Sequence, residues 1–128
     1  MRTSRPVRYA KRARGRDRAW IMKNIDACRK VLSEIAALLE EGREDGYCAI
    51  VRSALSGPDT SLTQFLVSNT LWGGAESIAD SALGNDRTRR GAFVSLMFKL
   101  GNLQIDARTT NVRTKTWVSV FQNALENS

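Results

Sequence analysis

The sequence predicts an all-α fold, a compact bundle of five to six helices formed by residues 22–128. Apolar residues recur mainly at steps of three and four, the spacing that places them on one face of a helix. Gly, Pro, Asn and Asp interrupt this pattern at short intervals, and short connections favour antiparallel neighbours. The chain has 128 residues, of which 42% are hydrophobic and 26% are charged. These values are typical of one globular domain.

The first helix is predicted over residues 18–41, with Gly42 as its C-cap. Its apolar stripe has nine members: Trp20, Ile21, Ile25, Cys28, Val31, Leu32, Ile35, Leu38 and Leu39. The two cysteines of the chain, Cys28 and Cys48, fall at apolar helix positions and form no C-x-x-C pair. We expect buried free thiols, and a disulfide between them across a helical hairpin is the alternative.

Strong turn signals separate the next two helices. One begins at Asp45 or Gly46 and places five apolar residues on one face: Tyr47, Ile50, Val51, Ala54 and Leu55. Residues 56–59 end it, because Gly57 and Pro58 together interrupt a helix. Asp59 or Thr60 then begins a third helix, which carries Leu62, Phe65 and Leu66. A strand over residues 65–67 is the alternative, but no alternation supports it.

Three further helices complete the predicted bundle. A short one spans residues 75–83 and directs Ile78, Ala79, Ala82 and Leu83 inward. The next spans residues 87–108, begins after Asn85 or Asp86 as N-cap, and is expected to kink near Gly101. The last spans residues 113–125, where Trp117, Phe121 and Leu125 step by four. Alternating Thr and Val residues give this last segment some strand character as well.

The excess positive charge of the chain lies entirely in its first 21 residues. The formal net charge is +7, and residues 1–21 contain eight basic residues and one acid. Residues 22–128 contain twelve of each, so this body is neutral as a whole. We expect the basic tail, residues 1–21, to be disordered because it is highly charged and poor in apolar residues. Seven of its residues are candidates for phosphate contacts: Arg5, Arg8, Lys11, Arg12, Arg14, Arg16 and Arg18.

Three origins of the basic tail are open. It is a nucleic-acid-binding arm, a targeting peptide, or an upstream extension of the reading frame with the native start at Met22. A targeting peptide is disfavoured, because the tail lacks an apolar stretch and has only Thr3 and Ser4 where a transit peptide is Ser-rich. The run from Met22 to Asp26 resembles an ordinary start that leads into a helix, which favours the extension.

The chain contains no histidine, and this excludes several classes of active site. Ser-His-Asp and Cys-His catalysis, His-ligated metals and His general acid–base chemistry all require that side chain. The sequence has no recognisable cofactor motif or nucleophile–base pair, so we expect no enzyme, no cofactor and no metal. No apolar run approaches the ~20 residues of a membrane span. An enzyme that uses carboxylates or arginines alone remains the catalytic alternative.

Acidic residues provide the candidate partner-binding sites. Glu40, Glu41, Glu44 and Asp45 cluster at the corner between the first two predicted helices. Complementary charge at such a corner would steer a basic partner toward it, although a solvated corner is the simpler interpretation. Glu76 and Asp80 are four residues apart, so they are expected to share one face of the short fourth helix and to meet a partner there. A metal or acid–base pair is the alternative for these two carboxylates.

One basic cluster, Arg87, Arg89 and Arg90, occurs in the body. It lies at the start of a predicted helix, where positive charge is electrostatically unfavourable. We therefore expect these arginines to contact an acid of the fold or a partner.

The segment from Leu71 to Asp80 is the most distinctive part of the sequence. Gly73 and Gly74 could form an anion-binding nest, but no phosphate-loop signature follows them and no Lys or Arg lies within ten residues. We expect a structural role instead, in which the glycines permit close packing and Trp72 anchors the core. Trp117 is expected to be a second core anchor.

The same segment carries a resemblance. Leu71-Trp72-Gly73-Gly74, with Ser77 and Asp80 and the C-terminal Trp117-Val118-Ser119, looks like a group of small bacterial proteins that share an LWGG…SxxD core. The resemblance covers about residues 22–125 and excludes the basic tail. It implies a bacterial setting and no particular activity or site residues.

These observations together predict a non-enzymatic protein-interaction module of the cytoplasm, such as an immunity or inhibitor protein that binds another protein. The alternative is a small nucleic-acid-associated protein that uses only residues 1–21 for that contact. The sequence predicts no contact with a membrane.

Overall fold

The computed structural model describes residues 22–127, and these residues form helices and no strand. This confirms the predicted all-α fold and shows that the strand alternatives for residues 65–67 and for the last segment were wrong. The predicted disorder of residues 1–21 and their seven candidate phosphate contacts lie outside the described residues. The helices are α2 (Ile25–Glu41), α3 (Asp45–Ser56), α4 (Asp59–Leu66), α5 (Asn69–Trp72), α6 (Ile78–Ser81), α7 (Arg87–Asp106) and α8 (Thr114–Glu126).

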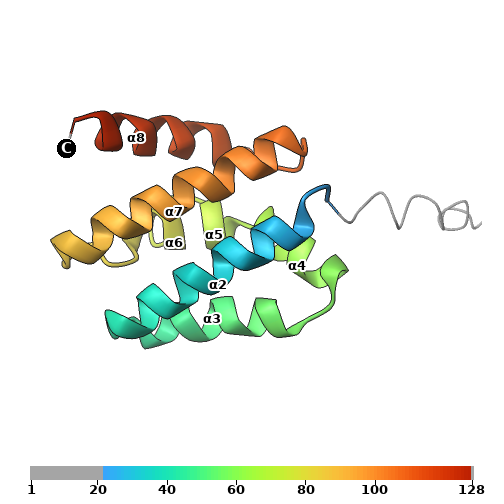
Figure 1. Ribbon diagram of the computed structural model, residues 1–128, viewed down its shortest axis with the longest axis horizontal. Coiled ribbons are helices and arrows are strands. Elements are labelled where there is room, and N and C mark those ends of the chain that lie inside the picture. Colours follow the sequence, from blue (N-terminus) through green and yellow to red (C-terminus); the bar gives the residue numbers. More distant parts are fainter. Residues whose placement is uncertain (1–21, 128) are drawn as a thin grey trace, which may run out of the picture.

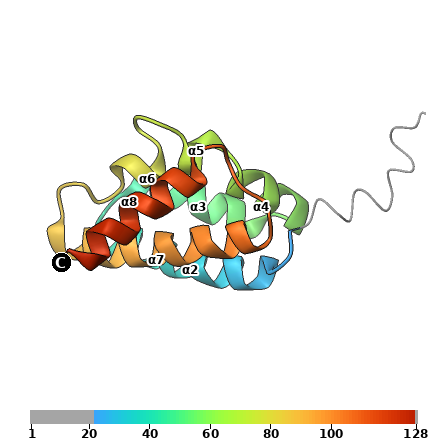
Figure 2. The same ribbon diagram turned by 90° about the horizontal axis from the view of Figure 1, so that it is seen from above.

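Four long helices lie side by side in the order α3, α2, α7 and α8, and each runs antiparallel to its neighbours (Figure 1). Helix α7 is central, because it packs against both α2 and α8. The chain between α3 and α7, which contains α4, α5 and α6, covers one side of this row (Figure 2). The end of α2 and the beginning of α7 therefore meet at the same end of the bundle, although Gly42 and Arg87 are far apart in the sequence.

The core contains the apolar stripes of all four long helices together with residues from α4, α5 and α6. Trp72 on α5 is fully buried, and its Nε1 donates a hydrogen bond to Oε1 of Gln104 on α7 at 2.9 Å. The side-chain amide of Gln104 donates to the carbonyl oxygens of Leu66 (2.8 Å) and Thr109 (3.0 Å). One fully buried polar side chain thus joins α5, the end of α4 and the turn after α7. This role of Gln104 is absent from the sequence prediction.

Two glycines are required for close packing rather than for backbone freedom. A Cβ on Gly101 would collide with Val118 on α8 and would lie 3.2 Å from the Trp72 ring. Gly101 therefore lets α8 approach α7, and α7 continues through it as one helix where a kink was predicted. Gly42 follows α2 as predicted, but its φ is −82° and the left-handed residue is Arg43, at φ 61°. A Cβ on Gly42 would collide with Leu83, so this position admits the buried Leu83 side chain.

Several predicted boundaries and exposures were wrong. The first helix begins at Ile25 within the described chain, because Asn24 adopts a left-handed conformation and its side-chain amide donates to Asp106 at 3.3 Å. The fourth helix is only the single turn Ile78–Ser81, and α5 is an additional turn. Ile50 was predicted to face the core, but it is 39% exposed.

The segment before α6 is held by one side chain that is distant in sequence, Trp117, and by one that is near, Ser77, which explains why the predicted fourth helix is short. The carbonyl oxygen of Gly73 accepts hydrogen bonds from Nε1 of Trp117 (3.1 Å) and from the Ser77 hydroxyl (2.9 Å). The Ser77 hydroxyl also accepts from the backbone N–H of Asp80, so the helical turn begins there. Tertiary contacts with α8 therefore override the helical tendency of residues 75–77.

Cys28 and Cys48 are both buried and free, as predicted, so no disulfide joins them. Burial raises the pKa of the Cys28 thiol to about 11, which makes it a poor nucleophile. Across residues 22–127, no helix combines the length and the apolar character that a bilayer crossing demands.

Candidate functional site

The fold brings the two predicted acidic groups to the same end of the bundle. Glu44 precedes α3, and its Oε2 accepts a hydrogen bond from the backbone N–H of Leu83 at 2.5 Å. Nearby, the Tyr47 hydroxyl on α3 donates to the carbonyl oxygen of Glu76 at 3.2 Å. The corner between α2 and α3 is thereby joined to the segment around α6.

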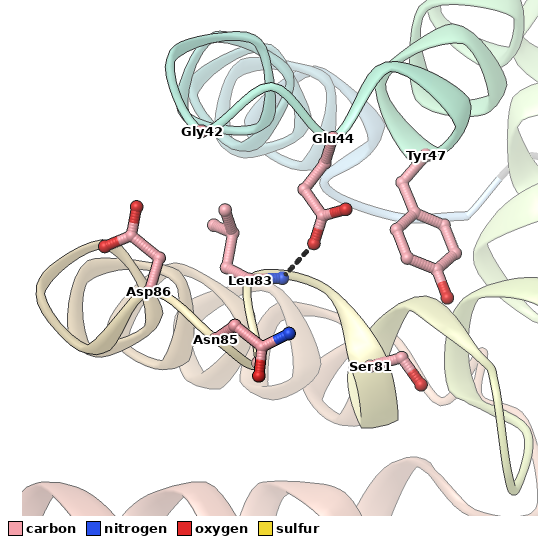
Figure 3. A pocket seen from close by; sticks show the side chains of 8 residues that line it. Gly42, Glu44, Tyr47, Ser81, Leu83, Asn85 and Asp86 are labelled. Atoms are coloured by element: carbon pink, nitrogen blue, oxygen red, sulfur yellow. Dashed lines mark hydrogen bonds between the residues drawn. The ribbon is translucent and has the colours of Figure 1, made fainter.

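A pocket of about 480 Å³ lies between these two parts (Figure 3). Glu44 and Tyr47 occupy one side, and Asn85 and Ser81 occupy the other (Figure 3). The lining contains two carboxylates, those of Glu44 and Asp86, and no basic residue. Its eight residues are Gly42, Glu44, Tyr47, Ser81, Leu83, Gly84, Asn85 and Asp86. The pocket is therefore electronegative and rich in hydrogen-bond acceptors.

Hydrogen bonds stabilise the charged form of two carboxylates near the pocket, Asp80 and Asp86. The backbone N–H of Glu76 and the Ser81 hydroxyl both donate to Asp80, and they lower the pKa of its carboxyl group below the ordinary value. Hydrogen bonds from the side chain and backbone of Arg89 lower the pKa of Asp86 in the same way. Both groups consequently remain negative at neutral pH and somewhat below their usual titration range.

Not all predicted acids face this pocket. Glu40 points to α3 instead, where its Oε1 pairs with Arg52 at 2.7 Å. Glu41 lies 3.6 Å from Arg89, and Asp45 is exposed in the first turn of α3. Glu41 and Asp45 therefore add negative charge around the pocket without lining it.

Glu76 and Asp80 do not share a helix face, so this prediction was wrong. Glu76 precedes α6 in a left-handed conformation with φ 69°, and its backbone N–H donates to Asp80 Oδ2 at 3.0 Å. The Asp80 carboxylate thus stabilises a local turn by accepting from the Glu76 backbone, and the two carboxylates are not paired. No group of three potential metal ligands occurs within residues 22–127.

Two residues of the predicted basic cluster, Arg89 and Arg90, are used within the fold, whereas Arg87 is exposed. Asp86 caps α7, and its carboxylate accepts from Arg89 at 2.8 Å, which offsets positive charge at the helix start. Arg90 donates to the carbonyl oxygens of Ala82 (2.7 Å) and Ala79 (3.0 Å), and its guanidinium lies 5.0 Å from the centre of the Phe93 ring. These contacts tie the α6 segment to α7 and hold one wall of the pocket. The expectation that these arginines contact an acid of the fold is confirmed for Arg89.

The two glycines of the LWGG segment have different environments. A Cβ on Gly73 would collide with the backbone of Asn69, which supports the predicted structural role. Gly74 lies beside Arg113, since its Cβ would be 3.7 Å from the guanidinium carbon. A basic side chain is thus close in space although none is close in sequence.

A second, more apolar hollow of about 260 Å³ adjoins the acidic pocket. It is lined by Glu44, Gly46, Tyr47 and Ile50, so both hollows share Glu44 and Tyr47. Sequence reasoning identified Glu44 but missed Tyr47, Ser81, Asn85 and Ile50 as surface residues. Residues 84–86 were recognised as a turn, and nothing in their spacing indicated that this turn would face α3.

The chain was compared with protein-family models, curated proteins and solved structures, and none of them matches.

Proposed function

We propose that this protein is a non-enzymatic interaction module that binds a basic surface of another protein through its acidic corner. One observation carries the proposal: carboxylates from two distant parts of the chain, Glu44 and Asp86, line a single pocket whose lining contains no basic residue. Complementary charge accelerates encounter and selects the correct partner. Immunity and inhibitor proteins are the class of bacterial protein in which we place it, in keeping with the expected cytoplasmic setting.

The remaining chemistry of the chain supports binding rather than catalysis. The whole sequence lacks histidine, and burial raises the pKa of the Cys28 thiol. The pocket offers carboxylates and neutral acceptors that are hydrogen-bonded to the fold on one side and open on the other. Such a surface recognises cationic side chains and leaves them chemically unchanged.

A triple variant of the full chain tests this proposal. Glu44→Gln, Asp45→Asn and Glu76→Gln remove three charges around the pocket, and the amide introduced at position 44 retains an oxygen acceptor for the Leu83 N–H. We expect the wild-type chain to capture a basic protein from the source cell, and the triple variant to lose at least about 90% of it. Quantitative mass spectrometry of the captured material measures this at low and at 0.5 M salt.

The matched control is Glu34→Gln, which removes an exposed charge from α2. It should retain capture, because its carboxylate lies outside the lining of the pocket. Equal capture by the wild type and the triple variant would contradict the proposal.

A nucleic-acid function through the basic tail is the second candidate, and the distribution of charge favours it. Residues 1–21 carry the whole net charge of +7, whereas the body is neutral. Non-specific affinity for nucleic acid comes mainly from lysine and arginine contacts with phosphates, and it falls steeply with salt. The tail alone has the charge density for several such contacts.

Replacing the seven candidate tail residues by Gln in the full chain tests this alternative. We expect the wild type to bind duplex DNA or single-stranded RNA weakly, with affinity that falls by at least tenfold between 50 and 200 mM salt (about two or more phosphate contacts). The variant should show no measurable binding in fluorescence anisotropy. Salt-resistant binding by the variant would instead assign nucleic-acid contacts to the body.

A further inference from the structure

The acidic pocket and the apolar hollow lie next to each other along α3, and we call the pair the groove. Glu44 and Tyr47 line both hollows. At the apolar end, Ile50 is 39% exposed, and a Cβ on Gly46 would meet no atom within 4 Å. The groove therefore offers an acceptor-rich part and an apolar part next to each other.

The polar part has hydrogen-bonding capacity that the described chain leaves unused. Glu44 bonds to Leu83 through Oε2, and its Oε1 has no partner within residues 22–127. The exposed Asn85 side chain likewise makes no hydrogen bond within residues 22–127. Tyr47 and Ser81 donate their hydroxyl protons to Glu76 and Asp80 and keep lone pairs that can accept.

The negative charge of the pocket favours a positively charged ligand. Glu44 and Asp86 are both in the lining, whereas Arg43 and Arg89 are not. Arg43 is exposed between Gly42 and Glu44, and Arg89 is paired with Asp86 and Glu41. An anion would be repelled, whereas a guanidinium brings five donors and no acceptor. Its planar face also stacks favourably on an aromatic ring such as that of Tyr47.

We propose that this groove binds an extended segment of the partner protein in which an arginine and an apolar residue are two positions apart. The arginine enters the acceptor-rich pocket at Glu44 and Asn85, and the apolar side chain covers Ile50. In an extended chain, residues i and i+2 point to the same side and lie about 7 Å apart, which suits two hollows that share lining residues. This inference rests on the proposed function and names the partner's recognition motif.

Titration of the isotope-labelled full chain with short peptides tests the motif. The probe is acetyl-Ser-Arg-Ser-Leu-Ser-amide, and its controls replace Arg by Gln or Leu by Ser. We expect saturable amide shifts in nuclear magnetic resonance spectra at Glu44, Tyr47, Ile50, Leu83 and Asn85. Each control peptide should bind at least about fivefold more weakly.

Two protein variants locate the two parts of the motif. Glu44→Gln should weaken binding of the probe about tenfold, and Ile50→Ser should abolish the difference between the Leu and Ser peptides. Glu34→Gln should change neither result. Equal affinity for all three peptides, or shifts confined to another surface, would overturn the inference.

Within residues 1–21 the chain itself contains this spacing at Arg5-Pro6-Val7, Arg8-Tyr9-Ala10 and Arg18-Ala19-Trp20, so a further variant separates the two possible sources of the segment. In the chain that carries Arg5→Gln, Arg8→Gln, Arg18→Gln and Trp20→Ser, unchanged peptide affinity supports a partner protein as the source. Tighter peptide binding would make the chain's own segment the occupant and overturn the inference. If no peptide binds but capture of a partner still depends on Glu44, Asp45 and Glu76, the motif is refuted. The proposed function is then unaffected.

Discussion

Replacement of Trp72 by Ala is expected to lower the free energy of unfolding by about 3–5 kcal/mol, the usual cost of emptying a large buried aromatic site. The Trp72 ring is fully buried, and it lies close to Gly101 at the point where α7 and α8 approach each other. Its loss would leave a cavity that α5 alone cannot fill, because the side chains around it belong to separate helices. Urea denaturation followed by circular dichroism measures the change.

Trp117→Ala is the informative comparison for this prediction. Trp117 is only half-buried on α8, although it stacks on Phe121 with ring centroids 5.5 Å apart and donates to Gly73. We expect its removal to cost less than removal of Trp72, so the two tryptophans are not equivalent anchors as the sequence predicted. Equal costs for both substitutions would contradict this ranking.

Replacement of Gln104 by Leu is expected to cost about 2–4 kcal/mol, although it places an apolar side chain of similar size in the core. The substitution leaves the Trp72 N–H and the Leu66 carbonyl oxygen without their buried partner. Each buried polar group that loses its hydrogen bond costs ~1–3 kcal/mol. The same denaturation experiment measures it, with Asn102→Ala on the exposed side of α7 as the control.

A double-mutant cycle gives this second prediction a sharper form. Trp72→Phe removes the donor of the shared hydrogen bond and keeps most of the ring volume. The cost of Gln104→Leu should therefore be smaller in the Trp72→Phe background than in the wild type. Strict additivity of the two substitutions would show that the hydrogen bond between them contributes nothing to stability.

Helical periodicity predicted most of the long helices because their apolar stripes are local properties of the sequence. The stripe from Cys28 to Leu39 is buried as expected except for Leu38, which is partly buried, and Asp86 caps α7 as expected. The same reasoning wrongly placed Ile50 in the core, because the sequence of one helix does not show which of its faces another helix will cover. It also failed for residues 75–77, where the Trp117 and Ser77 side chains both donate to the carbonyl oxygen of Gly73.

The candidate site was predicted only in part. The acids at residues 40–45 were recognised as a cluster, but Glu40 pairs with Arg52 on α3. The opposite wall of the pocket, with Ser81 and Asn85, has no motif of its own. It became recognisable only through the Glu44–Leu83 and Tyr47–Glu76 hydrogen bonds.

The sequence by itself determined the helical class, the turns after α2, after α3 and before α7, and the separation of a +7 tail from a neutral body. These properties depend on composition and on the period of apolar residues along one segment. The tertiary structure alone decided that α2 and α7 lie together, with the corner at Glu44 beside the turn at Asn85. The physical reason is that a pocket forms from surfaces left over when several helices bury their apolar faces together. Its location therefore depends on the packing of the whole chain.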